Sequence, residues 1–265
     1  MSKKVAILTG GTSGIGRATA LALQERGYTV YELSRRAEGM PDIRHIVADI
    51  TKEETLQAAV EQVLAVEGRL DLVVNNAGFG ISGAIEFTDT QEAQRLFDTL
   101  FFGMVRMNRC VIPLMRQQGH GRIVNISSVA APVPIPFQAY YSAGKAAINA
   151  YTMALANELR PFGVTVCAVM PGDIKTGFTA ARHKIIDGDD IYQGRIGRSV
   201  QRMEHDEQTG MDPAKVGRYI AAVASREGSH HPLYATRIDY KFFVFLTKVL
   251  PARFLNWLIY QLYGK

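Results

Sequence analysis

The chain has little of what several protein classes require. Its only cysteines, Cys110 and Cys167, lie in separate apolar stretches without a CxxC pair or a histidine at ligand spacing. This pattern argues against a disulfide scaffold and a structural zinc site, and we expect no metal. The net charge is only +5, and most basic residues lie beside acids or in short pairs. We therefore expect no nucleic-acid partner.

Long apolar runs are also absent. At the N-terminus two lysines are followed at once by the apolar residues 5–8 and a turn, which is too short for a signal-peptide core. Near the C-terminus the run at 242–246 is soon interrupted by Lys248, Pro251 and Arg253, so we predict no membrane-spanning segment. These features favour a cytoplasmic protein.

With 265 residues, of which 47% are hydrophobic and 21% charged, the chain can bury one large core. Short apolar runs alternate with segments long enough for helices, and we expect strands at 5–9, 29–33, 45–48, 72–75, 122–127 and 164–169. Runs that are apolar throughout suit a parallel sheet covered on both faces. The pattern predicts an α/β fold, a single doubly wound Rossmann-type domain over residues 1–265.

One late segment, residues 179–212, departs from this alternation. It is polar, contains four glycines and lacks a clear hydrophobic period. Such a segment in a compact domain is typical of a mobile loop, so we predict a substrate lid here.

The tail, residues 242–263, is rich in apolar residues. Its second part spaces them three and four residues apart, which predicts an amphipathic helix with a stripe formed by Leu255, Leu258, Ile259 and Leu262. We expect this stripe to pack on the parent domain or against a second subunit of a homo-oligomer, a dimer or tetramer. Contact with a membrane surface is the alternative, because Arg253 and Lys265 flank the stripe and Trp257 can sit at an interface.

A glycine-rich turn follows the first expected strand and precedes a helical pattern. Glycines let the backbone approach a pyrophosphate, and the N–H groups at a helix N-terminus bind its oxygens. The spacing is GxxxGxG rather than GxGxxG. We predict a dinucleotide-binding turn, with a ligand-free tight turn as the alternative. The expected contacts are Gly10, Thr12, Ser13, Gly14, Ile15 and Gly16.

The end of the second expected strand bears on cofactor choice. An acid about twenty residues past the turn binds a ribose 2′-hydroxyl, whereas an arginine accommodates a 2′-phosphate. This chain has Ser34, Arg35 and Arg36 there, and Glu32 lies too early, inside the strand. We therefore favour NADP(H) over NAD(H), with a solvated basic pair as the alternative.

Tyr141 and Lys145 open a later helical pattern four residues apart, so their side chains share one face of its first turn. A phenol has a pKa near 10, and a nearby cation favours the ionised form. We predict that Lys145 lowers the pKa of Tyr141 and that Tyr141 is a general acid or base. An ordinary surface pair is the alternative.

Taken in order, these motifs resemble the classical short-chain dehydrogenase/reductase family over nearly the whole chain. The glycine-rich turn, Asp49 after the third strand, residues 75–78 after the fourth, Ser128 thirteen residues before Tyr141, and the Pro-Gly pair at 171–172 all stand in family order. The resemblance implies an NAD(P)-dependent oxidoreductase that interconverts an alcohol and a ketone. Its catalytic residues would be Ser128, Tyr141 and Lys145.

The resemblance also implies further cofactor contacts. Asp49 would reach the adenine, Asn75 and Ala77 would line the cleft, Lys145 would hold the nicotinamide ribose, and Thr176 would bind the carboxamide. The remaining implied contacts are Ile50, Gly78, Pro171, Gly172 and Ile174. One position departs from the family pattern, because Leu100 stands where an asparagine usually anchors a proton-relay water. Leucine cannot relay a proton, so the relay must use a backbone carbonyl or be weaker.

The substrate is less defined. Residues 128–163 and the tail pattern are similar to the 17β-hydroxysteroid dehydrogenase-like branch, and an apolar pocket is expected from Phe79, Val133, Ile135, Phe137, Met170 and Phe178. Such a pocket suits a hydrophobic substrate, either steroid-like or another lipophilic or small carbonyl compound. A non-catalytic NADP(H)-binding regulator is an alternative prompted by Leu100, although it would not need Ser128 and Tyr141. A scaffold protein would not need the phosphate-binding turn.

Overall fold

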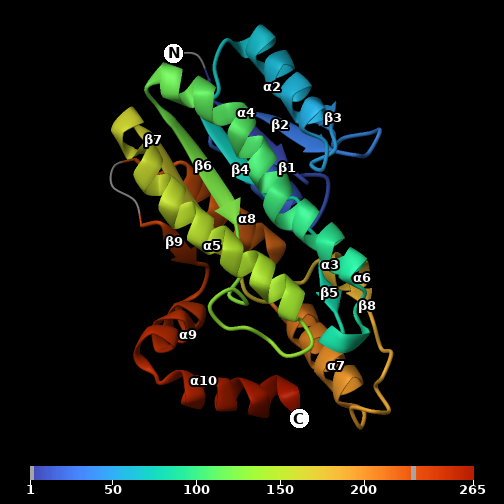
Figure 1. The fold of residues 1–265 in the computed structure, drawn as a ribbon. Coiled ribbons are helices and arrows are strands. Elements are labelled where there is room, and N and C mark those ends of the chain that lie inside the picture. Colours follow the sequence, from blue (N-terminus) through green and yellow to red (C-terminus); the bar gives the residue numbers. More distant parts are fainter. Residues whose placement is uncertain (1–2, 228–230) are drawn as a thin grey trace.

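A seven-stranded sheet, parallel throughout, forms the centre of the molecule, with the strand order β3-β2-β1-β4-β6-β7-β9 (Figure 1). The computed structural model describes residues 3–227 and 231–265. The strands are β1 (Val5–Thr9), β2 (Thr29–Ser34), β3 (Arg44–Val47), β4 (Leu72–Asn75), β6 (Gly121–Ile126), β7 (Val164–Met170) and β9 (Leu233–Ala235). The order reverses on either side of β1, so the predicted single doubly wound α/β domain is confirmed.

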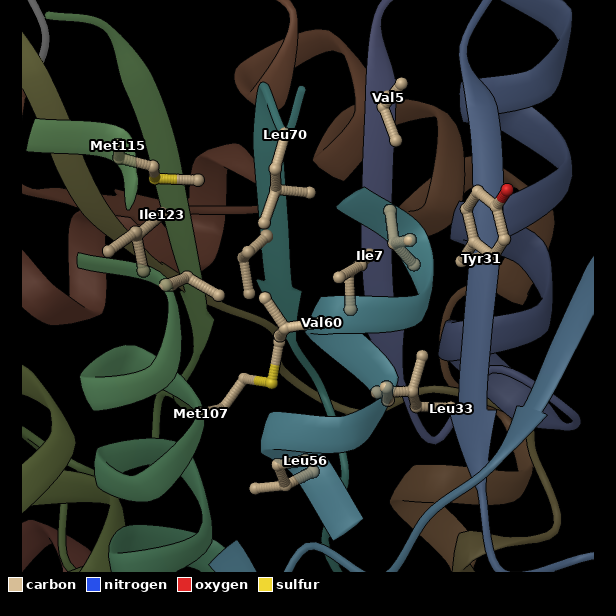
Figure 2. Packing of buried hydrophobic residues seen from close by; sticks show 14 of the residues in the cluster. Val5, Ile7, Tyr31, Leu33, Leu56, Val60, Leu70, Met107, Met115 and Ile123 are labelled. Atoms are coloured by element: carbon tan, nitrogen blue, oxygen red, sulfur yellow. The ribbon is translucent and has the colours of Figure 1, made fainter. Parts of the chain in front are cut away.

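Helices cover both faces of this sheet. On one face lie α2 (Glu53–Glu67), α4 (Gly103–Gln118) and α5 (Ala139–Leu159), and α4 and α5 cross the front of the sheet in Figure 1. On the other face lie α1 (Gly14–Glu25) and α8 (Pro213–Ala224). Figure 2 shows how Leu56, Val60 and Met107 from the helices meet Ile7 and Ile123 from the strands. Because each strand is packed on both sides, β1 and β4 are buried at every residue.

Short elements complete the region after β4. They are the parallel pair β5 (Ile81–Ser82) and β8 (His183–Lys184), α3 (Thr90–Phe97), the 3-10 helices η1 (Ile85–Phe87) and η3 (Arg160–Phe162), and the π-helical turn η2 (Asp98–Phe102). Strand β9 was not predicted, because its apolar run is only three residues long and it lies at the sheet edge.

The segment predicted as a lid is more regular than its sequence suggested. It contains the end of α6 (Phe178–Ala181), β8, and the fourteen-residue helix α7 (Arg195–Gln208). Ile196, Val200 and Met203 are buried at helical spacing and pack with Ile135 and Phe137. The prediction that this segment lacks a period was therefore wrong over α7, because three apolar residues among many charges are enough to anchor a helix.

The C-terminal tail forms α9 (Ile238–Val249), α10 (Ala252–Ile259) and the π-helical turn η4 (Tyr260–Gly264). The expected stripe is only partly correct. Ile259 is buried and Leu255 and Leu258 are partly buried, whereas Leu262 is 47% exposed and Tyr263 packs inward in its place. The π-helical turn changes the periodicity after Ile259, which explains the exchange.

Candidate active site

A cavity of about 1070 Å³ opens at the carboxyl ends of β1, β4, β6 and β7. This is the edge of a doubly wound sheet where ligands bind. Most residues proposed from the sequence line this one cavity: Gly10, Thr12, Ser13, Gly14, Ile15, Gly16, Ser34, Arg35, Arg36, Ile50, Ala77, Gly78, Ser128, Tyr141, Lys145, Pro171, Gly172, Ile174 and Thr176. Segments that are far apart in the sequence therefore meet around a single volume.

The glycine-rich turn is packed directly on the loop after β4. A Cβ atom on Gly10 would lie 2.9 Å from the Cα of Ala77, and one on Gly16 would lie 2.2 Å from the Gly10 carbonyl oxygen. The Asn76 side chain donates hydrogen bonds to the carbonyls of Thr9 and Gly10 at 3.1 and 2.9 Å. No acid lies in the first turn of α1, so its N–H groups face the cavity without a competing carboxylate.

Glu32 supports the same turn from inside the sheet. Its side chain is fully buried, accepts a hydrogen bond from the Gly11 N–H at 3.0 Å, and contacts His45 Nδ1 at 2.5 Å. Glu32 is therefore a structural acid that fixes the turn. Sequence reasoning assigned no role to Glu32 or Asn76, although an acid in the middle of an apolar strand is itself a signal of a buried partner.

The cavity rim after β2 has polar groups that are free to meet a ligand. Ser34 Oγ is buried and has no hydrogen-bond partner among the described residues. Arg35 and Arg36 are exposed, and within residues 3–227 and 231–265 neither guanidinium makes an ion pair or a hydrogen bond. An orphaned hydroxyl beside two free guanidinium groups fits a phosphate monoester.

Two expected cofactor residues do not line the cavity. The Asp49 carboxylate accepts hydrogen bonds from Thr51 N–H and Oγ at 3.0 and 2.8 Å. Burial raises the pKa of Asp49, but these bonds outweigh it and hold the pKa below its ordinary value. Asn75 is buried and donates to Asn108 and Asn125 at 2.8 and 2.9 Å. The side chain of Asn75 thus points into the core, because the odd-numbered residues of β4 face the α4 side.

The three expected catalytic residues come together at the inner end of the cavity. Tyr141 and Lys145 lie on the first turns of α5, and Lys145 Nζ is 5.6 Å from the centre of the Tyr141 ring. Lys145 is buried and donates a hydrogen bond to the carbonyl of Ile126 at 2.7 Å. Ser128, just after β6, accepts a hydrogen bond from the Ala130 N–H at 3.1 Å.

The protonation states differ from the sequence prediction. Burial raises the pKa of Tyr141 to about 12, and the interaction with the Ser128 hydroxyl only partly offsets this rise. Burial also lowers the pKa of Lys145 to about 7. The expected lowering of the Tyr141 pKa is therefore not seen in the protein without cofactor, because desolvation outweighs the lowering effects of the Ser128 hydroxyl and the Arg182 charge.

The chain is similar in sequence to proteins of one known family. Residues 4–185, more than half of the chain, match the family model for short chain dehydrogenases. The chain belongs to the short-chain dehydrogenase/reductase family. A 3-ketodihydrosphingosine reductase from Bacteroides thetaiotaomicron is 38% identical over 97% of this chain and 94% of its own length.

Solved structures of this family have the same fold. A short-chain dehydrogenase from Streptomyces avermitilis is 33% identical with a TM-score of 0.84, covering 98% of this chain and 97% of its own. A 3-ketoacyl-(acyl-carrier-protein) reductase from Brucella melitensis, solved with NADH, is 28% identical with a TM-score of 0.74, covering 88% and 96%. A nicotinamide cofactor and a small substrate are thus the expected ligands of this short-chain dehydrogenase.

Leu100 marks where this short-chain dehydrogenase departs from the family pattern. It lies in the π-helical turn η2, is buried, and packs in the cluster that includes Tyr141. A Cβ on Gly78 would lie 2.4 Å from Leu100 Cδ2, so the leucine fills the space beside this loop. Lys145 donates its hydrogen bond to the backbone carbonyl of Ile126, and the effect of Leu100 on the proton relay stays a prediction.

The substrate side of the cavity is only partly the pocket that was expected. Phe79, Ile135 and Phe178 line it, and the Phe178 ring lies 5.8 Å from that of Tyr141. Val133, Phe137 and Met170 do not line it. Met170 is buried in the core, and Phe137 packs edge-on against Tyr192.

A polar wall faces these aromatic rings and was missed in the sequence. Glu207 on α7 lines the cavity, where it accepts hydrogen bonds from Arg182 and Thr179. The Arg182 side chain is fully buried. Asp173 also lines the cavity and accepts a hydrogen bond from the Tyr240 hydroxyl at 3.0 Å. These partners lie 25 to 67 residues apart in the sequence, so no local motif marks them.

Proposed function

We propose that this short-chain dehydrogenase is an NADPH-dependent reductase that converts a lipophilic ketone to a secondary alcohol. The observation that supports it is the arrangement of one cavity, which joins the glycine-rich turn and two free arginines to Ser128, Tyr141 and Lys145. Neither a sensor nor a scaffold needs a proton donor beside a phosphate-binding turn.

The protein residues divide the reaction between them. When bound, a nicotinamide cofactor would be held by the glycine-rich turn and the rim after β2 and would supply a hydride to the carbonyl carbon. The Ser128 hydroxyl holds the carbonyl oxygen by a hydrogen bond, and the Tyr141 hydroxyl donates a proton to that oxygen as the alcohol forms. With a pKa of about 12, Tyr141 is protonated at neutral pH, which suits the reductive direction. Lys145, with a pKa of about 7, can return a proton toward Tyr141.

The preference for NADPH rests on the rim after β2. Ser34, Arg35 and Arg36 all line the cavity, and no acid lies at the position that would bind a ribose 2′-hydroxyl. Two charge-assisted contacts to a 2′-phosphate would favour NADPH over NADH.

The substrate class rests on the apolar rings and on similarity to the Bacteroides enzyme. Phe79 and Phe178 provide apolar walls beside Tyr141, and a relative 38% identical over 97% of the chain is a 3-ketodihydrosphingosine reductase. A long-chain ketone of this kind is our proposed substrate. The sequence also suggests steroid-like substrates, and the experiment below compares the two substrate classes.

The test is NADPH oxidation, followed at 340 nm, with 3-ketodihydrosphingosine, a 17-ketosteroid and a short aliphatic ketone, each repeated with NADH. We expect the highest kcat/KM with the long-chain ketone and NADPH. A higher kcat/KM with the ketosteroid would contradict the substrate class, and no turnover with any ketone in either direction would favour the regulator.

Two other properties stay predictions. Exposed Phe102 beside α4 and Met153 on α5 provide apolar contacts for a homo-oligomer, and the subunit count can be measured by analytical ultracentrifugation. No helix among the described residues is long and apolar enough to cross a membrane. The cytoplasmic location can be checked by cell fractionation.

A further inference from the structure

The C-terminal helices expose an unusual amount of apolar surface. On α9, Ile238, Phe242, Phe245 and Val249 are 80%, 58%, 56% and 55% exposed. Their spacing of four, three and four residues places them on one side of the helix, as an apolar stripe that faces solvent. An apolar stripe on a helix normally faces the core, so this one indicates a surface that meets another apolar phase.

More exposed aromatic side chains lie on α10, which follows α9 after a turn at Leu250 and Pro251. Phe254 and Trp257 are each about half exposed, and their rings stack with centroids 5.7 Å apart. Tyr260 is 44% exposed. We call the exposed side chains of α9, α10 and Tyr260 the outer tail face. Aromatic rings of this kind are enriched where protein meets the headgroup region of a bilayer.

The charge of the tail is mostly of one sign. Residues 238–265 contain Lys241, Lys248, Arg253 and Lys265, and their one acid, Asp239, pairs with Arg237, so these residues carry a net charge of +3. Lys241 and Lys248 are exposed beside the α9 stripe, and no acid pairs with either within the described residues. Cations that flank an apolar stripe are attracted to anionic lipid headgroups.

The same charges disfavour a second copy of the chain as the occupant. In a two-fold interface the same patch meets itself, so the cations of one tail would face those of the other, and the one acid of α9 and α10, Asp239, is already paired with Arg237. An anionic bilayer satisfies both the apolar stripe and the charge.

The tail is also fixed to the cavity wall. The Tyr240 hydroxyl bonds both the N–H and the carboxylate of Asp173 at 3.0 Å. At the other end, the Gly264 carbonyl accepts a hydrogen bond from Arg195 at 2.6 Å, and Tyr263 donates one to Asp206 at 3.1 Å. Figure 1 shows α9 and α10 at the same end of the molecule as α7, beyond the tips of the strands. A surface held in this place lies next to the cavity rather than across the molecule from it.

We infer that the outer tail face binds peripherally to an anionic lipid surface, with its aromatic rings in the headgroup region and its lysines against lipid phosphates. The inference depends on the exposed surface and its charge. It does not depend on the substrate, so a failed ketone assay leaves it untouched.

Trp257 is the sole tryptophan of the chain and provides an internal probe. Full-length protein would be mixed with phosphatidylcholine vesicles, with or without phosphatidylglycerol, and followed by co-sedimentation and Trp257 emission. We expect binding to the anionic vesicles only, a blue shift of the emission, and quenching by lipids with brominated acyl chains. Raising the salt concentration should weaken the binding.

Matched variants locate the surface. Phe242→Ser with Phe245→Ser, and separately Lys241→Glu with Lys248→Glu, should each weaken vesicle binding by about tenfold or more. Val66→Ser with Phe162→Ser removes exposed apolar groups elsewhere and should leave binding unchanged. Circular dichroism and thermal unfolding check that each variant is folded.

Three results would overturn the inference. They are no vesicle binding by the wild type, equal binding to neutral vesicles, and a lower subunit count in the Phe242→Ser, Phe245→Ser variant without any vesicle binding. The last result would make the tail a contact between protein chains.

Discussion

The two ends of the cavity are built in opposite ways. At the cofactor end the wall is backbone: Gly10 and Gly16 leave no room for a side chain, and half-buried Asn76 and buried Glu32 hold the turn in place. At the substrate end the wall consists of side chains that lie outside the sheet, among them Phe79, Phe178 and Glu207 of α7. The reaction is therefore encoded in short motifs, whereas the substrate is selected by contacts between distant segments.

At the cofactor end, the largest expected effect comes from removing the proton donor. Tyr141→Phe keeps the ring that packs on Phe178 but removes the hydroxyl, so kcat should fall by about 10²- to 10⁴-fold while the Kd for NADPH stays near its wild-type value. Tyr140→Phe is the matched control, since Tyr140 packs in the same cluster, and it should stay active. Substantial ketone reduction by Tyr141→Phe would show that another group donates the proton.

The rim of the cofactor end should determine cofactor choice. Replacing Arg35 and Arg36 by alanine should raise the Kd for NADPH by about 10- to 100-fold and change the Kd for NADH little, because only NADPH has a 2′-phosphate. Titration of nucleotide fluorescence measures both constants, and Arg26→Ala controls for the loss of surface charge. Equal effects on the two cofactors would leave the arginines as a solvated pair.

The sequence predicts the cofactor end of the cavity better than the substrate end. The bounds of β1 and β4 were predicted correctly, because a strand buried on both faces gives an uninterrupted apolar run. The glycine-rich turn and the trio of Ser128, Tyr141 and Lys145 could be found because each motif is local or has a fixed order.

What the sequence did not reveal depends on partners far along the chain. Glu207 reaches the cavity only because Arg182 and Thr179 orient it, and Asn75 turns inward because Asn108 and Asn125 accept its hydrogen bonds. Burial likewise decides the pKa of Tyr141, and burial cannot be read from spacing.

A stability comparison sharpens the contrast between the backbone wall and the tail. Gly16→Ala forces a Cβ against the Gly10 carbonyl and should lower the free energy of unfolding by about 1–3 kcal/mol. Gly144→Ala, whose Cβ would have 3.5 Å to its nearest neighbour, should not destabilise the protein. Phe242→Ser on the outer tail face should stay within about 0.5 kcal/mol of wild type. Urea unfolding measures all three, and a large loss for Phe242→Ser would mean that the stripe is packed.

The smallest expected effect concerns Lys145. Its pKa is near 10.5 when exposed and about 7 when folded, so between these values the unfolded chain binds more protons and stability rises with pH. Below pH 7 both states are protonated and the burial cost is complete. Relative to Lys145→Met, the wild-type Tm should therefore rise by about 2–4 °C between pH 7 and 8. A difference in Tm that does not change with pH would show that Lys145 stays charged in the folded protein.

The contact between Tyr240 and the Pro-Gly turn requires a glycine at position 172. A Cβ on Gly172 would lie 2.0 Å from the Tyr240 ring, so any larger residue there would displace the start of α9. The same ring bonds Asp173 through its hydroxyl, which ties the tail to a wall of the cavity. Coupling between two binding sites is reciprocal. If a ligand in the cavity shifts this turn and changes the affinity of the tail for a lipid surface, binding to that surface changes the affinity for the ligand by the same factor. The contact between residues 172 and 240 therefore connects the wall of the cavity to the exposed C-terminal helices.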